Sequence, residues 1–268
     1  MEHSPFDVSG RVIIVTGAAG QLGSRYTRSL ERAGAAVIAW DHRDPEKLEA
    51  MRAGSDGAAE AALVELTDES VVAMEVARVV RSFGHIDGVV NNAAMNPAVE
   101  SPDAAAMFAP YEHYDMALYR RELEVNLVGP MCVIKHVAPH LMARRRGSIV
   151  NIASEVSTIA HDHRVYDAGE EMFKSIAYTT SKAAILGFTR QWAARLGSHN
   201  VRVNALSIGG VKNAKIPEAF AQRFGSNAML GRMAEPDEYC ATLQYLLSDA
   251  SSFMTGTNLI VDGGKHAW

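Results

Sequence analysis

Tyr178 and Lys182 are the first candidate pair for chemistry, because they lie four positions apart in a segment that is predicted to be a helix from about 176 to 196. Residues four apart stand on the same face of a helix, so the phenol would lie beside the ammonium. An adjacent cation favours the phenolate, and such a tyrosine can exchange a proton with a substrate oxygen near neutral pH. The alternative is a chance pair on a helix face with a solvated lysine. Other motifs in the chain are needed to choose between these two interpretations.

A glycine-rich segment near the N-terminus indicates a binding loop. Residues 11–16 form a short, β-branched apolar run, which predicts a strand buried on both faces. Glycines follow at positions 17, 20 and 23, and the next residues up to Ala33 have the periodicity of a helix. Glycines in this place let the backbone approach a pyrophosphate, whose charge faces the free amides of the helix start. A plain tight turn is the alternative, but the flanking strand and helix favour a dinucleotide site.

Asp41 ends the second predicted strand, residues 36–40. A carboxylate at this place can bond both ribose hydroxyls of the adenosine half and would repel a 2′-phosphate. The sequence therefore favours NAD over NADP, although Arg43 close by would soften that preference. The alternative is that Asp41 is a turn residue that caps the next helix.

The rest of the chain continues the alternation of strands and helices. Further strands are predicted at 61–65, 88–91, 147–152, 201–206 and 258–261, and further helices at 67–83, 116–142, 176–196 and 236–247. This order is typical of an α/β fold, a doubly wound, seven-stranded parallel sheet with helices on both faces, and we expect one domain over residues 1–268. Ligands bind at the carboxyl edge of such sheets, where loops at 98–110 and 208–230 are expected.

Two further polar residues have both a structural and a functional interpretation. Asn126 lies inside a helical pattern, beside Gly129 and Pro130, where a break in hydrogen bonding is expected. An asparagine there usually faces water or bonds its own backbone, and the functional alternative is that it holds a water or a lysine in a proton path. Ser154 follows the fifth strand, where its hydroxyl either bonds a substrate oxygen or is satisfied by backbone.

Composition excludes several other classes of protein. With 268 residues, 48% of them hydrophobic and 21% charged, a net charge of -5 and a pI of about 6.1, the chain has no nucleic-acid footprint. Cys132 and Cys240 are far apart, which favours small core residues in a reducing compartment. We expect no signal peptide and no membrane span, hence a cytoplasmic protein. His161 and His163 suggest a metal, but without further placed ligands solvated loop residues are favoured, so no metal site is predicted.

In this order, the motifs resemble those of the short-chain dehydrogenase/reductase family over essentially the whole chain. Residues 16–23 are similar to its cofactor loop, and residues 91–94, Asn-Asn-Ala-Ala, to its Asn-Asn-Ala-Gly element. Residues 178–182 match its Tyr-x-x-x-Lys motif. The resemblance implies a Rossmann-type oxidoreductase, a small-molecule substrate, NAD as cofactor and a homotetramer.

The resemblance also implies roles for individual residues. Tyr178 would be the general acid/base, Ser154 would orient the substrate oxygen, and Lys182 would lower the pKa of Tyr178 and bond the nicotinamide ribose. Asn126 would hold the water that links Lys182 to solvent. The implied cofactor contacts are Gly17, Gly20, Gln21, Leu22, Gly23, Asp41, Glu65, Leu66, Asn92, Ala93, Tyr178, Lys182, Gly209 and Val211.

The sequence departs from the family pattern in four places. Gln21 stands where compact members carry glycine, which makes the loop similar to that of the longer, sugar-modifying branch. Ala94 and Ile208 replace a usual glycine and a usual proline. The interval from Ser154 to Tyr178, 24 positions, is longer than usual and contains a polar insertion at about 155–177.

The insertion has to emerge beside the substrate pocket, because it joins two predicted catalytic residues. We expect it to contact a polar, hydroxyl-rich substrate through residues such as His163, Arg164 and Tyr166. Similar insertions occur in short-chain enzymes of bacterial surface-sugar and flagellin modification. Three functions remain open: an NAD(H)-dependent alcohol dehydrogenase or carbonyl reductase on a small polar molecule, an epimerase or dehydratase of a sugar derivative, and a non-catalytic NAD-binding sensor.

Overall fold

The structure is a computed structural model that describes residues 4–53, 60–96, 104–166 and 172–268. Within these residues seven strands form one parallel sheet in the order β3-β2-β1-β4-β5-β6-β7. The strands are β1 (Val12–Thr16), β2 (Ala36–Asp41), β3 (Glu60–Leu63), β4 (Gly88–Asn91), β5 (Gly147–Ser154), β6 (Val201–Ile208) and β7 (Asn258–Val261). The predicted fold class is confirmed, and β5 and β6 are each two residues longer than expected.

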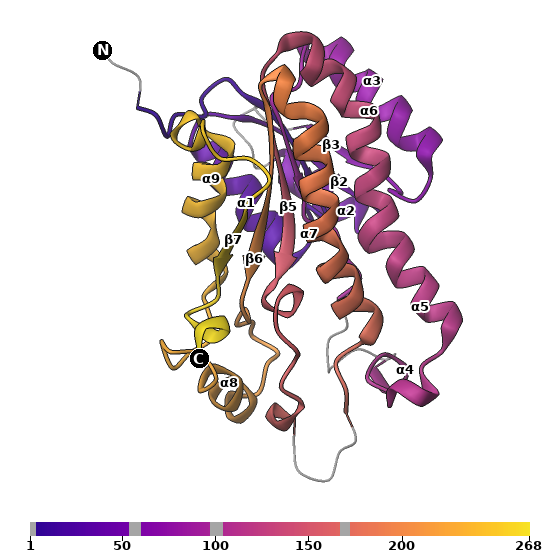
Figure 1. The fold of residues 1–268 in the computed structure, drawn as a ribbon. Helices are drawn as coiled ribbons and strands as arrows, with labels where there is room; N and C mark the ends of the chain where they lie inside the picture. The colour runs from indigo at the N-terminus through magenta and orange to yellow at the C-terminus, as the bar shows by residue number, and fades with distance from the viewer. Residues whose placement is uncertain (1–3, 54–59, 97–103, 167–171) are drawn as a thin grey trace.

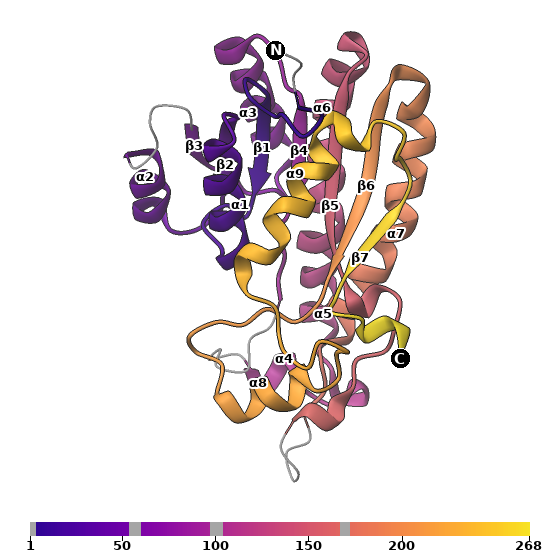
Figure 2. The same cartoon turned by 90° about the vertical axis from the view of Figure 1, so that its left-hand side faces the viewer.

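Helices cover both faces of the sheet, as Figures 1 and 2 show. They are α1 (Gln21–Arg32), α2 (Pro45–Ala53), α3 (Glu69–Phe83), α4 (Ala104–Met107), α5 (Met116–Leu123), α6 (Gly129–Arg144), α7 (Ile176–Leu196), α8 (Glu218–Gly225) and α9 (Cys240–Leu247). One core cluster packs α3, α6 and α7 against the sheet, and the other packs α1 and α9 against its opposite face. The inner strands are largely buried because each face is covered, whereas the edge strands β3 and β7 are partly exposed.

The predicted helix at 116–142 is interrupted, as the glycine and proline at 129–130 indicated. It consists of α5, a π-helical turn at Glu124–Val128, and α6, which has Pro130 in its first turn. Proline has no backbone N–H to donate, so it fits the start of a helix rather than its middle. The π-helical turn contains Asn126, and such turns often mark functional positions.

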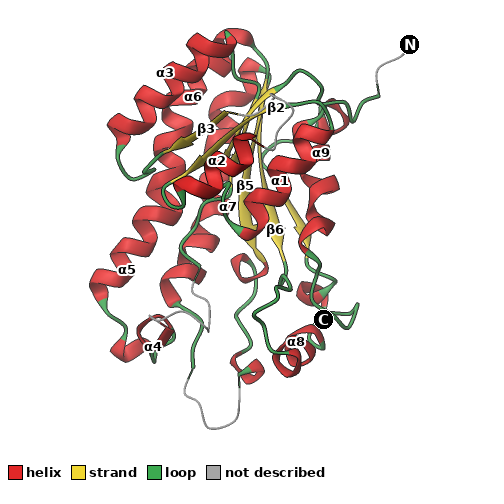
Figure 3. Cartoon of the chain, turned by 180° about the vertical axis from the view of Figure 1, so that it is seen from behind, coloured by secondary structure: helices red, strands yellow, loops and turns green. Residues whose placement is uncertain are grey.

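Two stretches that were predicted to be loops contain short helices. In 98–110 the described residues include α4, and in 208–230 they include α8. Phe220 and Phe224, four apart on α8, pack with Phe108, Val165 and Tyr166 in one apolar cluster. Tertiary packing of this kind stabilises helices that are too short to form alone. Figures 1 and 3 show α4 and α8 beyond the carboxyl ends of the strands, where they enclose the ligand edge of the sheet.

Candidate active site

A cleft of about 1020 Å³ lies along the carboxyl ends of the strands. Every residue predicted to contact the cofactor lines it except Gly23, and Ser154 lines it as well, whereas Asn126 does not. The loops after β1, β2 and β4 line the half that is predicted to hold the nucleotide, which we call the nucleotide half. The other half is lined by α4, α8 and the insertion, and we call it the substrate half. A site at this edge, where the strand order reverses beside β1, is what an open parallel sheet predicts.

Close backbone packing explains the glycines of the nucleotide half. Gly17 has a φ of +64°, and a Cβ on it would lie 2.8 Å from the Cα of Ala93. A Cβ on Gly23 would lie 2.0 Å from the carbonyl oxygen of Gly17. The first turn of α1 can therefore pack against the loop only because Gly23 has no side chain. Gly20 is the N-cap of α1 and its helix start has no side-chain cap, so free amides remain for an anion.

Asn92 and Gln21 join the glycine loop to its neighbours. The Asn92 side-chain amide donates to the carbonyl oxygens of Thr16 at 2.9 Å and Gly17 at 3.2 Å. The Gln21 amide donates to the carbonyl oxygen of Lys212 at 2.7 Å. Gln21, one of the four departures from the family pattern, therefore ties the glycine loop to the segment that follows β6.

Asp41 lies at the adenosine end, where its carboxylate also organises the loop. It accepts hydrogen bonds from the backbone N–H of Ala19 at 3.0 Å and of Arg43 at 3.1 Å, and its side chain is 10% exposed. The alternative in which Asp41 caps the next helix is wrong, because Asp44 accepts from the N–H of Lys47 at the start of α2. Asp41 is the last residue of β2, at the edge of the cleft.

Glu65 and Leu66 follow β3 and complete this end of the cleft. Glu65 accepts from the Thr67 hydroxyl at 2.7 Å and from the Thr67 N–H at 3.1 Å. Burial raises the pKa of Glu65, but the hydrogen bonds from Thr67 outweigh burial and hold that pKa below its ordinary value. Glu65 is therefore a carboxylate near neutral pH.

Tyr178 and Lys182 share one buried face of α7, as their spacing predicted. Tyr178 is 8% exposed, Lys182 is 4% exposed, and the Lys182 Nζ lies 5.7 Å from the centroid of the Tyr178 ring. The Lys182 ammonium donates to the Ile152 carbonyl at 2.6 Å. Burial raises the pKa of Tyr178 to about 12 and lowers that of Lys182 to about 8. Burial thus dominates here, and the expected lowering of the tyrosine pKa by Lys182 is not seen.

The backbone interpretation of Ser154 is confirmed, and its contact with a substrate oxygen stays a prediction. It ends β5, and its hydroxyl oxygen accepts from the N–H of Val156 at 3.4 Å. The Ser154 hydroxyl also faces Tyr178 and lowers the tyrosine pKa against the larger effect of burial. The structure therefore brings Ser154, Tyr178 and Lys182 together.

Asn126 is buried behind the cleft and neither faces water nor bonds its own helix. Its side-chain oxygen accepts from the N–H of Met95 at 2.7 Å, and its amide donates to the Met95 carbonyl and the Ser181 hydroxyl, both at 3.1 Å. Asn126 thus joins the loop after β4 to α7. It orders the backbone next to the predicted catalytic residues rather than contacting the cleft.

The insertion contributes different side chains from those expected. Arg164 is 91% exposed and bonds Asp162, and His163 packs against Tyr111 and Phe173 outside the cleft. Of the three expected residues, only Tyr166 lines the cleft. His161 and Lys174 line it in place of the other two. Asp167, Glu170 and Glu171 of the insertion lie outside the described residues.

Ser175 and Glu122 hold the start of α7, and sequence reasoning missed both. Ser175 is the N-cap of α7, and its hydroxyl accepts from the N–H of Tyr178 at 3.1 Å. That hydroxyl also bonds the fully buried carboxyl of Glu122, at 3.0 and 2.8 Å to its two oxygens. Tyr114 donates to the same carboxyl. A serine before a helical pattern is an N-cap signal, so Ser175 was detectable, whereas Glu122 was not.

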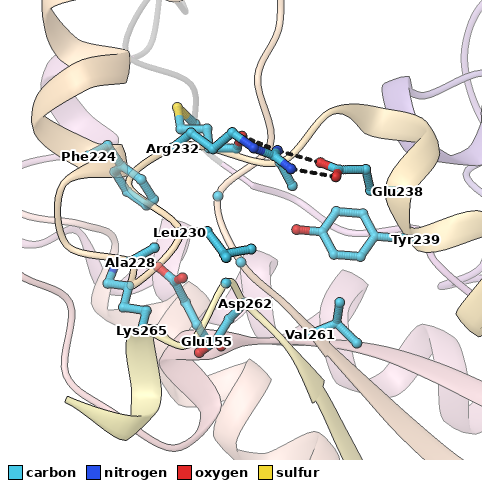
Figure 4. A pocket seen from close by; sticks show the side chains of 15 residues that line it. Glu155, Phe224, Ala228, Leu230, Arg232, Glu238, Tyr239, Val261, Asp262 and Lys265 are labelled. Carbon is cyan, nitrogen blue, oxygen red and sulfur yellow. Dashed lines mark hydrogen bonds and ion pairs between the residues drawn. The ribbon is translucent and has the colours of Figure 1, made fainter.

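A smaller pocket of about 170 Å³ separates the C-terminal segment from the α8 region. Figure 4 shows its lining, with the exposed ion pair of Arg232 and Glu238 above and Glu155 and Lys265 below. Glu155 directly follows Ser154, and its carboxylate lies 2.6 Å from the Lys265 ammonium, with both side chains at most 6% exposed. This buried pair ties the C-terminus to the end of β5.

Histidines, cysteines and apolar helices bear on whether the protein binds a metal, forms disulfides or spans a membrane. Among the described residues, no group of three or more His, Cys, Asp or Glu side chains could hold a metal ion. His161 is not the solvated loop residue that was expected. Its ring is largely buried, and burial lowers its pKa to about 3, so the ring stays neutral. Cys132 and Cys240 are buried and free, as predicted. No helix in the described part of the chain is long and apolar enough to cross a membrane.

Known proteins match the chain over nearly its full length. A family model described as enoyl-(acyl carrier protein) reductase matches residues 17–266. The chain is 31% identical to the 3-oxoacyl-(acyl-carrier-protein) reductase FabG of Thermotoga maritima, over 96% of this chain and 98% of that protein. It is 34% identical to the 2,5-dichloro-2,5-cyclohexadiene-1,4-diol dehydrogenase of Sphingobium indicum, over 97% of this chain and 99% of that protein.

Solved structures agree with these matches. A gluconate 5-dehydrogenase from Burkholderia cenocepacia in complex with NADP and tartrate has a TM-score of 0.86 at 26% identity, covering 98% of each chain. An NAD⁺-bound xylitol dehydrogenase has a TM-score of 0.82 at 30% identity, covering 96% of this chain and 99% of that one. Because the sheet order, the sequence motifs and the whole-length matches agree, the chain belongs to the short-chain dehydrogenase/reductase family.

Proposed function

We propose that the protein is an NAD(H)-dependent oxidoreductase that interconverts an alcohol and a carbonyl on a small polar molecule. The observation that carries the proposal is the grouping of Ser154, Tyr178 and Lys182 in a cleft that continues to the glycine loop. A non-catalytic NAD sensor would have no need of these proton-transfer residues. The relatives support a reaction at alcohol groups, because their names describe dehydrogenases of a diol, gluconate and xylitol.

The nucleotide half fits a nicotinamide dinucleotide. The glycines at 17 and 20 let the loop pack closely against neighbouring backbone, and the amides at the start of α1 would hold the pyrophosphate. Asp41 and Glu65 would contact adenosine, and Gly209 and Val211 the nicotinamide side. The bound cofactor supplies hydride exchange at its nicotinamide ring.

The chain itself supplies orientation and the proton path. The Ser154 hydroxyl would hold the substrate oxygen next to the Tyr178 phenol, which takes the hydroxyl proton in oxidation and returns it in reduction. For this the pKa of Tyr178 has to fall from about 12, and the Lys182 ammonium is near enough to stabilise the phenolate. Asn126 joins the loop after β4 to α7 through its hydrogen bonds to Met95 and Ser181. We propose that it also holds the water between Lys182 and solvent.

A preference for NAD rests on the carboxylate of Asp41, which would repel a 2′-phosphate. The neighbours bind either cofactor, since the gluconate 5-dehydrogenase carries NADP and the xylitol dehydrogenase carries NAD⁺. Arg43 beside Asp41 adds positive charge at the same edge. Steady-state kinetics with both cofactors test the preference: kcat/KM should be higher with NAD, and Asp41→Ala should reduce the difference.

A homotetramer is part of the proposal, supported by apolar side chains on the outer face of the α6 region. Val128 is 37% exposed and Met131 is 41% exposed, three residues apart. Such side chains on a helix surface favour contact with another copy. Light scattering after gel filtration would measure the molar mass.

The decisive experiment follows absorbance of the reduced nicotinamide with a panel of sugars, polyols and hydroxy acids. Net formation of reduced cofactor supports the proposal. Product without a net change of cofactor supports the epimerase or dehydratase instead. NAD binding with no product from any member of the panel contradicts the proposal and favours the sensor.

A further inference from the structure

Lys174 of the insertion is a second lysine at the predicted proton-transfer site. Its Nζ lies 4.5 Å from the centroid of the Tyr178 ring, closer than the 5.7 Å of Lys182. It also lies 5.8 Å from the centroid of Phe108 and donates to the side-chain oxygen of Asn96 at 2.6 Å. Lys174, Phe108 and Asn96 all line the cleft. The ammonium is thus held beside the phenol, among residues of the substrate half.

Cationic side chains line the substrate half. Among the described residues, the charged side chains that line it are Lys174, Arg223 and Glu155. Glu155 shares a buried ion pair with Lys265, and the Arg223 Nε donates to the Val165 carbonyl at 3.0 Å. Cations that line a partly enclosed cleft attract an anionic ligand and repel a cationic one.

The carboxyl of Glu122 attracts the Lys174 ammonium and offsets its positive charge only in part. Its hydrogen bonds come from Tyr114 and Ser175, and burial raises its pKa above the ordinary value. Coulomb attraction to Glu122 and Glu155 opposes the effect of burial on Lys174, whose pKa is about 8. Lys174 therefore remains largely an ammonium near neutral pH.

His161 adds an unused hydrogen-bonding atom to the same wall. Its Nε2 is buried and has no hydrogen-bond partner among the described residues. The ring is held between Tyr166, at 5.7 Å between centroids, and Phe224, at 6.0 Å. A buried polar atom without a partner costs free energy, and a ligand that bonds it recovers that cost. The imidazole is neutral, and in the tautomer with its proton on Nε2 it donates to an anionic oxygen.

We propose that Lys174 and His161 form a recognition site for a carboxylate on the substrate, with Lys174 as the specificity-determining cation. The site rests on the proposed function and narrows its substrate class to small hydroxy acids, or polyols that carry a carboxylate near the reacting carbon. Lys174 binds the anion, His161 donates to it, and Ser154 and Tyr178 engage the neighbouring hydroxyl or carbonyl oxygen. The substrate half recognises charge, whereas Tyr178 performs the proton transfer.

Two other roles for Lys174 predict different measurements. If the ammonium mainly stabilises the Tyr178 phenolate, its loss lowers kcat for every substrate and moves the pH profile to higher pH. If it only ties the insertion to Asn96, its loss lowers stability and affects charged and neutral substrates alike. Recognition of a carboxylate affects charged substrates alone.

The test compares Lys174→Met with the wild type on matched pairs that differ only in the anion, such as gluconate with glucitol. The carboxylate should be favoured at least about tenfold in kcat/KM, and Lys174→Met should remove that preference mainly through KM, with neutral substrates nearly unchanged. Lys174→Arg should recover part of it. Lys215→Met, on an exposed neighbouring loop, serves as the matched control and should keep the preference.

A binding measurement separates this proposal from the proposed function. Titration calorimetry of tartrate into NAD-saturated protein should show binding that Lys174→Met weakens at least about tenfold and His161→Phe weakens less. If no substrate turns over but tartrate shows this pattern, the oxidoreductase proposal fails and the carboxylate site stands. Equal losses for charged and neutral ligands would overturn the site. A phosphate ester, such as glycerol 3-phosphate, that binds tenfold better than the carboxylates would overturn the choice of anion.

Discussion

The two halves of the cleft are built in different ways. In the nucleotide half, backbone groups form the surface, as in the glycine loop, where a Cβ on Gly17 or Gly23 would collide with neighbouring backbone. In the substrate half, side chains form the surface, including His161, Tyr166 and Lys174. A backbone surface can hold the same cofactor in many relatives, while a side-chain surface can change with each substrate.

The difference indicates where this protein acquired its own specificity. The nucleotide half is supported by strands that the sheet fixes on both sides, whereas α4, α8 and the insertion meet in a separate apolar cluster. Tyr178 and Ser154 lie where the halves meet, because α7 begins at the end of the insertion and β5 ends at its start. Substitutions in one half should therefore leave the function of the other measurable.

The largest expected effect is at this junction. Tyr178→Phe removes the hydroxyl that exchanges the proton but keeps the ring that packs against Lys174. General acid/base groups contribute about 10²–10⁴-fold, so kcat should fall by at least about 10²-fold. The dissociation constant for NAD, measured by fluorescence titration, should change little. Full turnover in this variant would refute the assigned acid/base.

The next largest effect concerns stability of the substrate half. Lys265→Met leaves the carboxylate of Glu155 buried without its partner, which costs about 3–5 kcal/mol of unfolding free energy. Arg232→Met is the matched control, because its ion pair with Glu238 has side chains that are 52% and 43% exposed and contributes at most about 1 kcal/mol. Urea denaturation measures both, and equal losses would contradict the contrast between buried and exposed pairs.

A smaller effect is expected in the nucleotide half. Gly23→Ala places a methyl group 2.0 Å from the Gly17 carbonyl oxygen, so the loop has to move away from α1. The dissociation constant for NAD should rise by about tenfold, while tartrate binding at saturating NAD should keep its dependence on Lys174. Gly197→Ala is the control, because its Cβ would meet no atom within 4 Å. An unchanged affinity for NAD in Gly23→Ala would show that the glycine is not needed there.

Sequence patterns predicted the nucleotide half well because local rules govern it. The β-branched run at 12–16, the glycine spacing and the N-cap Asp68 each have a physical signal that acts within a few residues. The seven strands and the common face of Tyr178 and Lys182 followed from periodicity in the same way. A helix at 45–53 was not predicted, since among its described side chains Leu48 is buried in the core and Met51 packs against the core only in part.

The substrate half was less predictable because distant residues form it. Lys174 belongs to the site only because the chain returns it to Asn96 and Phe108, which no local pattern shows. The end of α6 is a related case, because Arg145 adopts the left-handed conformation there, with a φ of +51°, where glycine is the usual residue. Gly147 instead begins β5, where a Cβ would lie 2.9 Å from the Leu141 side chain.

The smallest effect tests the neutral His161 of the substrate half by pH. Burial lowers its pKa from 6.5 to about 3, with further lowering by Lys174, Lys265 and His163 and opposition from Asp162. Between pH 6.5 and 3 the unfolded chain binds a proton at this position that the folded chain does not, so stability is fully present above pH 6.5 and falls below it. From pH 7.5 to 5.5 this loss should be about 1 kcal/mol, measured by urea denaturation at each pH. His161→Phe should show a shallower slope than the wild type, while His113→Phe, at an exposed position, should keep the wild-type slope. If His161→Phe also keeps that slope, the ring binds its proton equally well in the folded and the unfolded chain. The ring would then be open to water, and the substrate half would not enclose it.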